Sequence, residues 1–234
     1  IFTINLSQTV IFLYWEWPKN NIMETIEQLE VIKKIKLRKL KLTDYDQVVG
    51  LQLKCFPGMK PWNETQFKNI ISIFPEGQIC IQYGKHIIAS SCSLIINFDD
   101  YSETASWNEL TANGNITNHN KQGDSLYGME IMVDHNYRGM KLTRRLYEGR
   151  KDIVRKHNLK KIVIGGRLPN YHKYSKDLTI DQFISKVMDR SIYDPVLTTQ
   201  LSNGFVLKRV LPNYLPKDIE SGGFATLLEW PNYN

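Results

Sequence analysis

The sharpest pattern in the chain is a change of hydrophobic period near residue 134. Over residues 127–133 apolar side chains alternate with other residues, which predicts a β-strand. Residues 134–140 form a turn-like connection. Apolar or small residues then recur at steps of four, three and four, as on one buried helix face: Leu142, Leu146, Gly149 and Ile153. The segment therefore predicts a strand, a short basic loop and an amphipathic helix in succession.

The same two periods predict the elements on either side of this segment. Helices are expected over residues 24–32, 43–56, 63–74, around 183–187 and over 195–201. Strands are expected over residues 35–38, 79–81, 86–97, 161–164, 205–211 and 224–230. Thr43 and Asn63 are expected to cap the second and third helices, and the lysines of the first strand are typical of a sheet edge. The polar stretch of residues 99–124 predicts a long loop.

This mixture predicts the α/β (α+β) class, with one domain built on a mixed central β-sheet flanked by helices. Residues 1–34 are interpreted as an N-terminal extension and residues 35–234 as the domain. Met23 is the first candidate initiator, so residues 1–22 are expected to lie outside the chemistry.

Composition excludes several classes of protein. With 42% hydrophobic and 23% charged residues, the chain is neither disordered nor fibrous. The first apolar run, residues 10–15, is much shorter than the roughly 20 residues of a membrane-spanning helix, and it lacks the features of a signal peptide. A cytoplasmic protein without membrane contact is therefore expected. Three cysteines without metal-ligand spacing (Cys55, Cys80 and Cys92) argue against a disulfide framework and a zinc site.

Positive charge is concentrated after the central strand. The formal net charge is +6, and residues 138–161 hold ten Lys or Arg against only Glu148 and Asp152. A strand that ends in a loop before a helix N-terminus directs backbone N–H groups and the positive helix dipole to one place. The surrounding cations add to that field. This predicts a binding site for a phosphate-bearing ligand.

The segment resembles the GCN5-related N-acetyltransferase superfamily. The acetyl-CoA motif of that family is Arg/Gln-x-x-Gly-x-Gly/Ala after a strand ending in valine, and Val133, Arg138 and Gly139 fit this frame. Lys141 and Thr143 stand where the motif has glycine and glycine or alanine. The order of elements also agrees, as does a late Gly-Phe pair at residues 204–205. The resemblance covers roughly residues 35–230.

A closer resemblance is to the acetyltransferase domain that precedes a nitrilase domain in some bifunctional bacterial proteins. It rests on short segments at residues 126–128, 165–169, 194–197, 200–201, 214–216 and 228–230. Because no nitrilase-sized segment follows Asn234, a freestanding version is expected.

The resemblance implies transfer of an acetyl group from acetyl-CoA, as cosubstrate and without a metal, directly to a primary amine. The acceptor would be a small molecule or a peptide, and the oligomeric state, a dimer included, is left open. The family pattern places the CoA-binding positions at Ile131, Met132, Val133, Arg138, Gly139, Met140, Lys141, Leu142, Thr143 and Arg144.

Glu130 on the central strand is the candidate base or amine-binding group, because acetyl transfer needs a neutral amine. Related enzymes often have a tyrosine acid four residues before the late Gly-Phe glycine, and Gln200 occupies that place. Tyr171 is therefore the candidate acid, with Tyr174 and Tyr193 as substitutes. The acceptor is expected between the early helices, the 99–124 loop and the segment after the fifth strand, where acids favour a cationic amine: Asp99, Asp100, Glu103, Glu109, Asp177 and Asp181.

Two alternatives stay open. The altered glycines and Gln200 are compatible with a CoA-binding module of acetyltransferase type that does not catalyse transfer. A nucleic-acid-binding protein is the third possibility, since the basic stretch would bind phosphates. No helix-turn-helix partner or stacking platform accompanies it, so a nucleic-acid partner is not expected.

Overall fold

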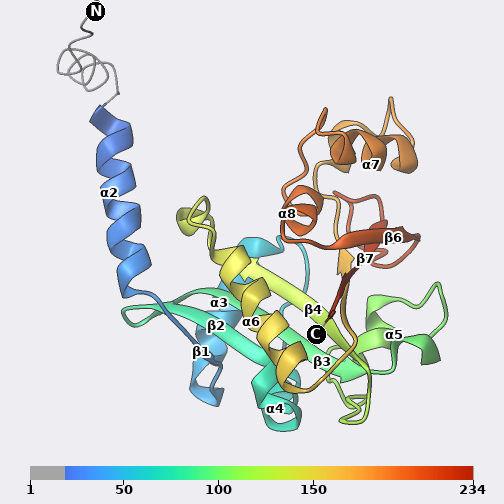
Figure 1. Ribbon diagram of the computed structural model, residues 1–234, viewed down its shortest axis with the longest axis horizontal. Coiled ribbons are helices and arrows are strands. Elements are labelled where there is room, and N and C mark those ends of the chain that lie inside the picture. Colours follow the sequence, from blue (N-terminus) through green and yellow to red (C-terminus); the bar gives the residue numbers. More distant parts are fainter. Residues whose placement is uncertain (1–18, 234) are drawn as a thin grey trace, which may run out of the picture.

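The computed structural model describes residues 19–233, and a seven-stranded sheet forms their centre. The strands are β1 Lys36–Lys39, β2 Gln78–Tyr83, β3 His86–Ile96, β4 Ser125–Val133, β5 Lys161–Gly166, β6 Val206–Leu211 and β7 Ala225–Pro231. Their order is β1-β2-β3-β4-β5-β7-β6. β4 and β5 are parallel, and the other neighbours are antiparallel. Figure 1 shows this sheet running through the molecule, with α2 projecting away from it.

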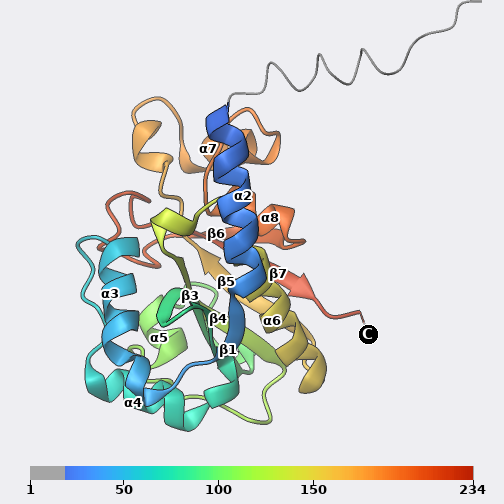
Figure 2. The ribbon, with the colours of Figure 1, turned by 90° about the vertical axis from the view of Figure 1, so that its left-hand side faces the viewer.

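Helices cover both faces of the sheet. They are α2 Lys19–Lys34, α3 Tyr45–Cys55, α4 Glu64–Ile73, α5 Trp107–Thr111, α6 Leu142–Lys156, α7 Ile180–Met188 and α8 Leu197–Ser202. Five short 3-10 turns join them: η1 Leu42–Asp44, η2 Pro75–Gly77, η3 Phe98–Asp100, η4 His135–Tyr137 and η5 Tyr171–Lys173. α6 packs along β2, β3 and β4, while α3 packs on β3 and β4. Figure 2 shows α3 and α6 on opposite sides of the strands.

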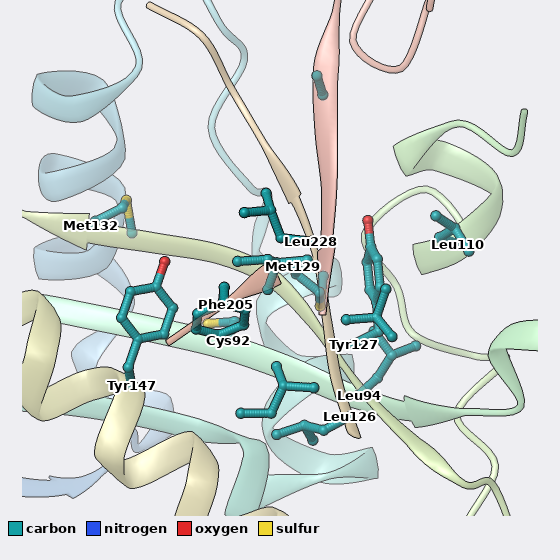
Figure 3. Packing of buried hydrophobic residues seen from close by; sticks show 14 of the residues in the cluster. Cys92, Leu94, Leu110, Leu126, Tyr127, Met129, Met132, Tyr147, Phe205 and Leu228 are labelled. Atoms are coloured by element: carbon teal, nitrogen blue, oxygen red, sulfur yellow. The ribbon is translucent and has the colours of Figure 1, made fainter. Parts of the chain in front are cut away.

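Two apolar clusters hold these layers together. A smaller one lies between α6 and strands β2 and β3, and its buried members are Ile79, Ile81, Ile88, Ala89, Leu142 and Leu146. The larger one extends from α3 and α4 across the sheet to α7 and α8. Figure 3 shows part of it, where Leu126 and Tyr127 of β4 meet Leu94 of β3. β4 therefore contributes buried side chains in the middle of the fold.

Most predicted elements are confirmed, and their boundaries follow from local chemistry. β1 lies at the sheet edge, as its lysines indicated. The Asn63 cap is confirmed, because its side chain accepts from Gln66 N in a reciprocal capping box. The predicted strand and helix around residue 134 are β4 and α6.

Two expectations about local structure were wrong. Thr43 does not cap a helix: a 3-10 turn precedes α3, and the cap residue Asp44 binds Arg38 instead (2.7 Å). Residues 99–124 are not simply a loop, because α5 forms inside them with a Ser106–Glu109 capping box.

The N-terminal helix is longer than predicted, since α2 begins at Lys19. Residues 1–18 of the expected extension lie outside the described residues, and the division at residue 34 stays a prediction. None of the helices within residues 19–233 has the length and apolar content needed to cross a bilayer.

Candidate active site

The central strand β4 leaves one edge open beyond Gly128. It pairs in parallel with β5 only over residues 125–128, whereas β5 goes on to pair with β7 and β4 continues along β3 to Val133. The two strands therefore separate. In the described part of the chain, residues 129–133 have β3 on one side and no strand on the other. An open strand edge of this kind can hydrogen-bond an extended ligand.

Three residues predicted to bind the cofactor lie on this open edge. Met132 is buried, whereas Ile131 and Val133 are half-buried and pack against the cluster beneath α6. Their side chains thus fix the strand on the sheet. Binding along Ile131–Val133 stays a prediction, and its physical basis is the backbone edge.

A β-bulge bends the strand where the two strands separate. Cys92 of β3 pairs with Glu130 and Ser93 pairs with Gly128, so Met129 is the extra residue. Side chains bind the carbonyl groups around it. Arg150 Nη2 donates to the carbonyls of Cys92 (3.0 Å) and Glu130 (2.5 Å). Trp107 Nε1 donates to the Met129 carbonyl (3.0 Å). The bulge is therefore held from α6 and from α5.

Arg150 is a buried cation beneath this bulge, with only 2% of its surface exposed. Burial lowers its pKa, and no carboxylate forms an ion pair with it among residues 19–233. Gly128 makes room for the guanidinium, since a Cβ there would lie 2.5 Å from Arg150 Nη1. The glycine in β4 therefore allows the arginine side chain of α6 to lie against the strand.

Glu130 is half-buried beside α3. Gln52 Nε2 donates to Glu130 Oε2 over 3.1 Å, while Glu130 Oε1 is buried and has no hydrogen-bond partner in the described residues. Burial raises the pKa of Glu130 to about 7, against the opposing effects of the Gln52 hydrogen bond and the Arg150 charge. A carboxylate that titrates near neutral pH is suited to accept a proton. Its catalytic role stays a prediction with favourable chemistry.

The loop after β4 is shaped by Asp134 and by two left-handed residues. Asp134 accepts from Asn136 N (3.1 Å) and from Lys54 Nζ (2.7 Å), which ties the loop to α3. Gly139 has φ +83°, and Lys141, the N-cap of α6, has φ 57° and ψ 27°. Left-handed backbone favours glycine. Lys141 therefore adopts the conformation for which the acetyl-CoA motif has glycine.

The N-terminus of α6 is open to an anion. No side chain caps it, and its first turn contains no acid. By contrast α4, α5 and α7 are capped by Asn63, Ser106 and Thr179. Free N–H groups at the positive end of a helix dipole bind phosphate readily. Of the predicted phosphate-loop residues, Arg138, Gly139, Lys141 and Arg144 are exposed, Met140 and Thr143 are half-buried, and Leu142 is buried.

Unpaired positive charge is confined to this end of the helix. The sequence count of ten cations overstated the exposed charge, because Arg150 and Lys151 are buried. Five of the ten form ion pairs: Lys151, Arg155, Lys156, Lys160 and Lys161. Within residues 19–233, no ion pair engages the four at the loop and first turn: Arg138, Lys141, Arg144 and Arg145. The field is therefore local to the phosphate loop.

A groove of about 520 Å³ runs beside these cations, between α2, β1 and α6. Ile32, Leu37 and Met140 give it apolar groups and Lys141, Arg144 and Arg145 give it basic ones. Its lining also includes the acids Glu148 and Asp152. Its shape and polarity suit a ligand with both an apolar and an anionic part.

Tyr171, the candidate acid, lies in an aromatic cluster. Its ring packs against Phe183 (5.4 Å) and Phe224 (6.1 Å), and its hydroxyl donates to the Leu178 carbonyl (3.4 Å). Within the described residues, none of its hydrogen bonds or ring contacts reaches Glu130 or the phosphate loop. A catalytic role for Tyr171 stays a prediction that these contacts do not support. Tyr174 joins the same cluster through Phe183.

A different tyrosine lies nearer to the expected place of the acid. Gln200 is buried against Gly166, and its side chain interacts with the hydroxyl of Tyr147 of α6. Tyr147 is fully buried and packs its ring against Phe205 (4.9 Å), as Figure 3 shows. Burial raises the pKa of Tyr147.

Two of the three cysteines, Cys80 and Cys92, are buried in the core. Burial raises the pKa of the Cys92 thiol well above its usual range, which keeps it protonated in the core. Burial also raises the pKa of Cys80 to about 12. No cluster of His, Cys, Asp and Glu suited to a metal occurs in residues 19–233.

Three residues at this site were missed by the sequence analysis: Gln52, Arg150 and Trp107. Arg150 had a usable signal, because it lies four residues after Leu146 on the buried face of the helix. Gln52 and Trp107 had none, since their partners in β4 are distant in sequence.

Comparison with known proteins places this site in a family. The chain is 35% identical over 194 residues to "Uncharacterized N-acetyltransferase YkwB" of Bacillus subtilis (strain 168), covering 81% of this chain and 85% of that protein. The chain belongs to the GCN5-related N-acetyltransferase family. The predicted resemblance, the mixed-sheet fold and the class of acyl-CoA-dependent transferases are therefore confirmed at the level of the family. No family model matches the chain.

Two further comparisons give a similar sequence and a similar fold. The chain is 47% identical over 209 residues to "Probable hydrolase YhcX" of Bacillus subtilis (strain 168), and these residues span 89% of this chain but only 41% of that protein. This agrees with the resemblance to acetyltransferase domains fused to hydrolases. The solved structure of "GphF GNAT-like decarboxylase in complex with isobutyryl-CoA" has a TM-score of 0.71 at 19% identity, over 84% of this chain and 98% of that one. It shares the fold.

Proposed function

We propose that this N-acetyltransferase transfers an acetyl group from acetyl-CoA directly to a primary amine, with Glu130 as the base. The observation that carries the proposal is the free Oε1 atom of Glu130, a buried acceptor without a partner among the described residues. Leaving such an acceptor unpaired is costly, and an ammonium or amine N–H of the acceptor substrate would satisfy it. The open edge of β4 begins beside this atom.

Acyl-CoA as the donor is supported by the phosphate loop. The pyrophosphate would lie over Arg138–Arg144, where α6 is uncapped and four cations are unpaired, and the pantetheine along Ile131–Val133. A nucleic-acid ligand fits less well, because the cations towards the end of α6 are occupied by ion pairs. The GphF structure holds isobutyryl-CoA, which supports an acyl-CoA on this fold without fixing the acyl group.

The reaction requires two proton transfers and the replacement of a C–S bond by a C–N bond. Glu130 takes a proton from the ammonium form of the acceptor, whose nitrogen then attacks the thioester carbonyl carbon. The C–N bond forms as the C–S bond breaks, and the second amine proton goes to the departing CoA thiolate. The proton on Glu130 returns to solvent. Backbone N–H groups of the open β4 edge would bind the carbonyl oxygen.

Some of the acids on which the expected preference for a cationic acceptor rests already have partners. The carboxylate of Glu109 binds Ser106 in the cap of α5, and Asp99 lies 3.9 Å from Lys161. Glu130 would add a carboxylate at the proposed site for the acceptor amine. A small-molecule or peptide amine remains the proposed acceptor.

A second candidate function is binding of acyl-CoA without transfer. The observation that favours it is Gln200, a buried amide where related enzymes have a tyrosine. In this case CoA would stabilise the protein, while no amine would consume acetyl-CoA.

The two functions are separated by an acyl-CoA consumption screen. Polyamines, amino acids, aminoglycosides and lysine peptides are offered with acetyl-CoA, and isobutyryl-CoA serves as an alternative donor. We expect acetyl-CoA turnover with at least one amine, and a loss of about 10²–10⁴-fold in kcat/KM for Glu130→Gln. The control is Glu30→Gln, an exposed glutamate of α2, which is expected to behave like the unmodified chain.

Binding of CoA is measured in parallel by titration calorimetry. Full activity of Glu130→Gln would contradict the base assignment. CoA binding without turnover for any amine would support the second candidate, and absence of CoA binding at millimolar concentration would overturn both.

A further inference from the structure

Gln52 of α3 fixes the orientation of the Glu130 carboxylate. Its Oε1 atom accepts a hydrogen bond from the backbone N–H of Trp62 (3.0 Å), and its Nε2 atom donates to Glu130 Oε2 (3.1 Å). A backbone N–H can only donate and an ionised carboxylate can only accept. A reversed amide would place donor against donor and acceptor against acceptor. The orientation of Gln52 is therefore determined by its two partners.

The clamp around Gln52 is rigid because three separate parts of the chain build it. Gln52 and Trp62 are each only 5% exposed. The hydroxyl of Tyr45, from the start of α3, donates to the Trp62 carbonyl (3.1 Å). Trp62 is thus held at both its N–H and its carbonyl group, and α3 itself packs on β3 and β4. Gln52 has no room to release Glu130 without breaking these contacts.

We propose that Gln52 is a positioning residue for acyl transfer: it anchors one carboxylate oxygen of Glu130 and leaves the other oxygen to the acceptor amine. The proposal rests on the function proposed above for Glu130. It assigns the two oxygens different tasks, because Oε2 is bound by Gln52 and Oε1 has no partner in the described residues.

The groups that face Glu130 show why Gln52 matters for its charge. The guanidinium of Arg150 in α6 binds the backbone carbonyl of Glu130 and not its carboxylate. Its positive charge therefore acts on the carboxylate only through space. Cys92 of β3 and Cys55 of α3 are neighbours with raised thiol pKa values, so they stay neutral. Only Gln52 donates a side-chain hydrogen bond to the carboxylate within residues 19–233. Burial raises the pKa of Glu130, and this hydrogen bond is the largest opposing effect.

The test compares Gln52 with Gln47, a second glutamine of the same helix. Gln47 Oε1 accepts from Ile87 N (2.9 Å), so it also binds a backbone N–H, but within residues 19–233 it makes no hydrogen bond to Glu130. Gln52→Glu keeps an oxygen for Trp62 N and, in its ionised form, offers no donor to Glu130. Gln52→Leu removes both. Gln47→Glu and Gln47→Leu are the matched controls.

The first readout is the titration of Glu130 itself, followed by ¹³C NMR of carboxyl-labelled glutamate and assigned by the Glu130→Gln variant. Because a hydrogen bond to a charged group is lost, we expect its midpoint to rise by about one to two pH units in both Gln52 variants. Gln52→Glu is expected to shift most, since it brings a second carboxyl group. Both Gln47 variants should leave the midpoint unchanged. Gln52→Leu adds no charge, so its shift isolates the lost hydrogen bond from the repulsion that Gln52→Glu adds.

The second readout is the pH dependence of kcat/KM. The acid limb of the rate profile should move with the NMR midpoint, so that Gln52→Glu is about tenfold slower or more at pH 7. An unmoved NMR midpoint in both Gln52 variants would overturn the positioning role. A moved midpoint with an unmoved rate profile would overturn the assignment of Glu130 as the base instead, which separates the two failures.

Discussion

The floor of the site (Gln52, Glu130 and Arg150) and the proposed phosphate loop after β4 differ in whether their polar groups already have partners. In the floor, Gln52 and Arg150 are buried and Glu130 is half-buried with an inaccessible Oε1 atom. Each of the three is bound by groups from other elements. In the loop, Arg138 and Lys141 are exposed and have no ion-pair partner within residues 19–233. One region is fixed before any ligand arrives. The other offers charge and N–H groups that a ligand must complete.

This difference teaches how the two tasks of a transferase can be divided within one short segment. A base needs an environment that sets its protonation, and burial with a fixed hydrogen bond provides this. A phosphate site needs a field and accessible donors, which exposure preserves. Residues 130 and 138 are only eight positions apart, so the chain passes from the floor to the exposed loop at the end of β4. Substitutions in the floor should therefore affect stability, and substitutions in the loop should affect affinity.

The largest effect is expected from Arg150→Met in the floor. Its guanidinium binds the carbonyls of Cys92 and Glu130, and removing it takes a charged donor from each of these two acceptors. We expect a loss of about 2–6 kcal/mol in the free energy of unfolding, at a cost of about 1–3 kcal/mol for each lost hydrogen bond. Urea denaturation measures this. Arg145→Met, an exposed cation of the same helix, should change stability by less than about 0.5 kcal/mol.

A double-mutant cycle sharpens this prediction. Gly128→Ala places a Cβ 2.5 Å from Arg150 Nη1, so it should destabilise the unmodified chain and be better tolerated with Arg150→Met. Equal costs for Arg150→Met and Arg145→Met would contradict the role of the buried cation in holding the bulge.

The strand and the helix on either side of the loop were predictable from sequence, whereas in the floor only Glu130 was named in advance. The change of period near residue 134 predicts a strand and a helix, and the glycine with its basic neighbours indicates the loop. The Gln52–Glu130 contact joins residues 78 positions apart, so no local pattern contains it. Arg150 was counted as a surface cation although its spacing from Leu146 places it on the buried face. A count of charged residues takes no account of burial, so it overestimated the exposed positive charge at Arg150.

The short helix α5 was not predicted from the sequence for a different reason. α5 has five residues, fewer than the window over which helical periodicity can be recognised. Its Ser106–Glu109 capping box is a local signal that was not used. The helix matters for the site, because it carries Trp107 to the Met129 carbonyl.

An intermediate effect is expected from Arg138→Glu in the loop. Reversing one unpaired charge beside the α6 N-terminus should weaken CoA binding about tenfold, or about 1.4 kcal/mol, with little change in stability. Calorimetric titration at low and high salt measures it, and the difference should shrink at high salt because exposed charges are screened. Arg155→Glu, at the other end of α6, is the matched control. Equal losses for the two variants would mean that net charge, rather than the loop, binds CoA.

The smallest effect is expected from Lys141→Gly, which places the motif's own residue in the loop. Lys141 has φ 57°, and Arg190, an exposed residue after α7, has φ 68°. Both variants remove a cation and relieve a left-handed backbone, against the larger chain entropy of glycine. We therefore expect both to gain up to about 1 kcal/mol in the free energy of unfolding.

Only the first should change CoA binding. Lys141→Gly loses a cation of the phosphate loop but lets the ligand approach the backbone closely. Its affinity should thus fall by less than about threefold at low salt, a difference of under about 0.7 kcal/mol. At high salt, where the lost charge counts for little, the affinity should equal that of the unmodified chain. Arg190→Gly should bind CoA normally at both salt concentrations. If Lys141→Gly lost stability while Arg190→Gly gained it, the lysine side chain would have a structural task in the loop, and the view of this region as one that awaits its ligand would be wrong.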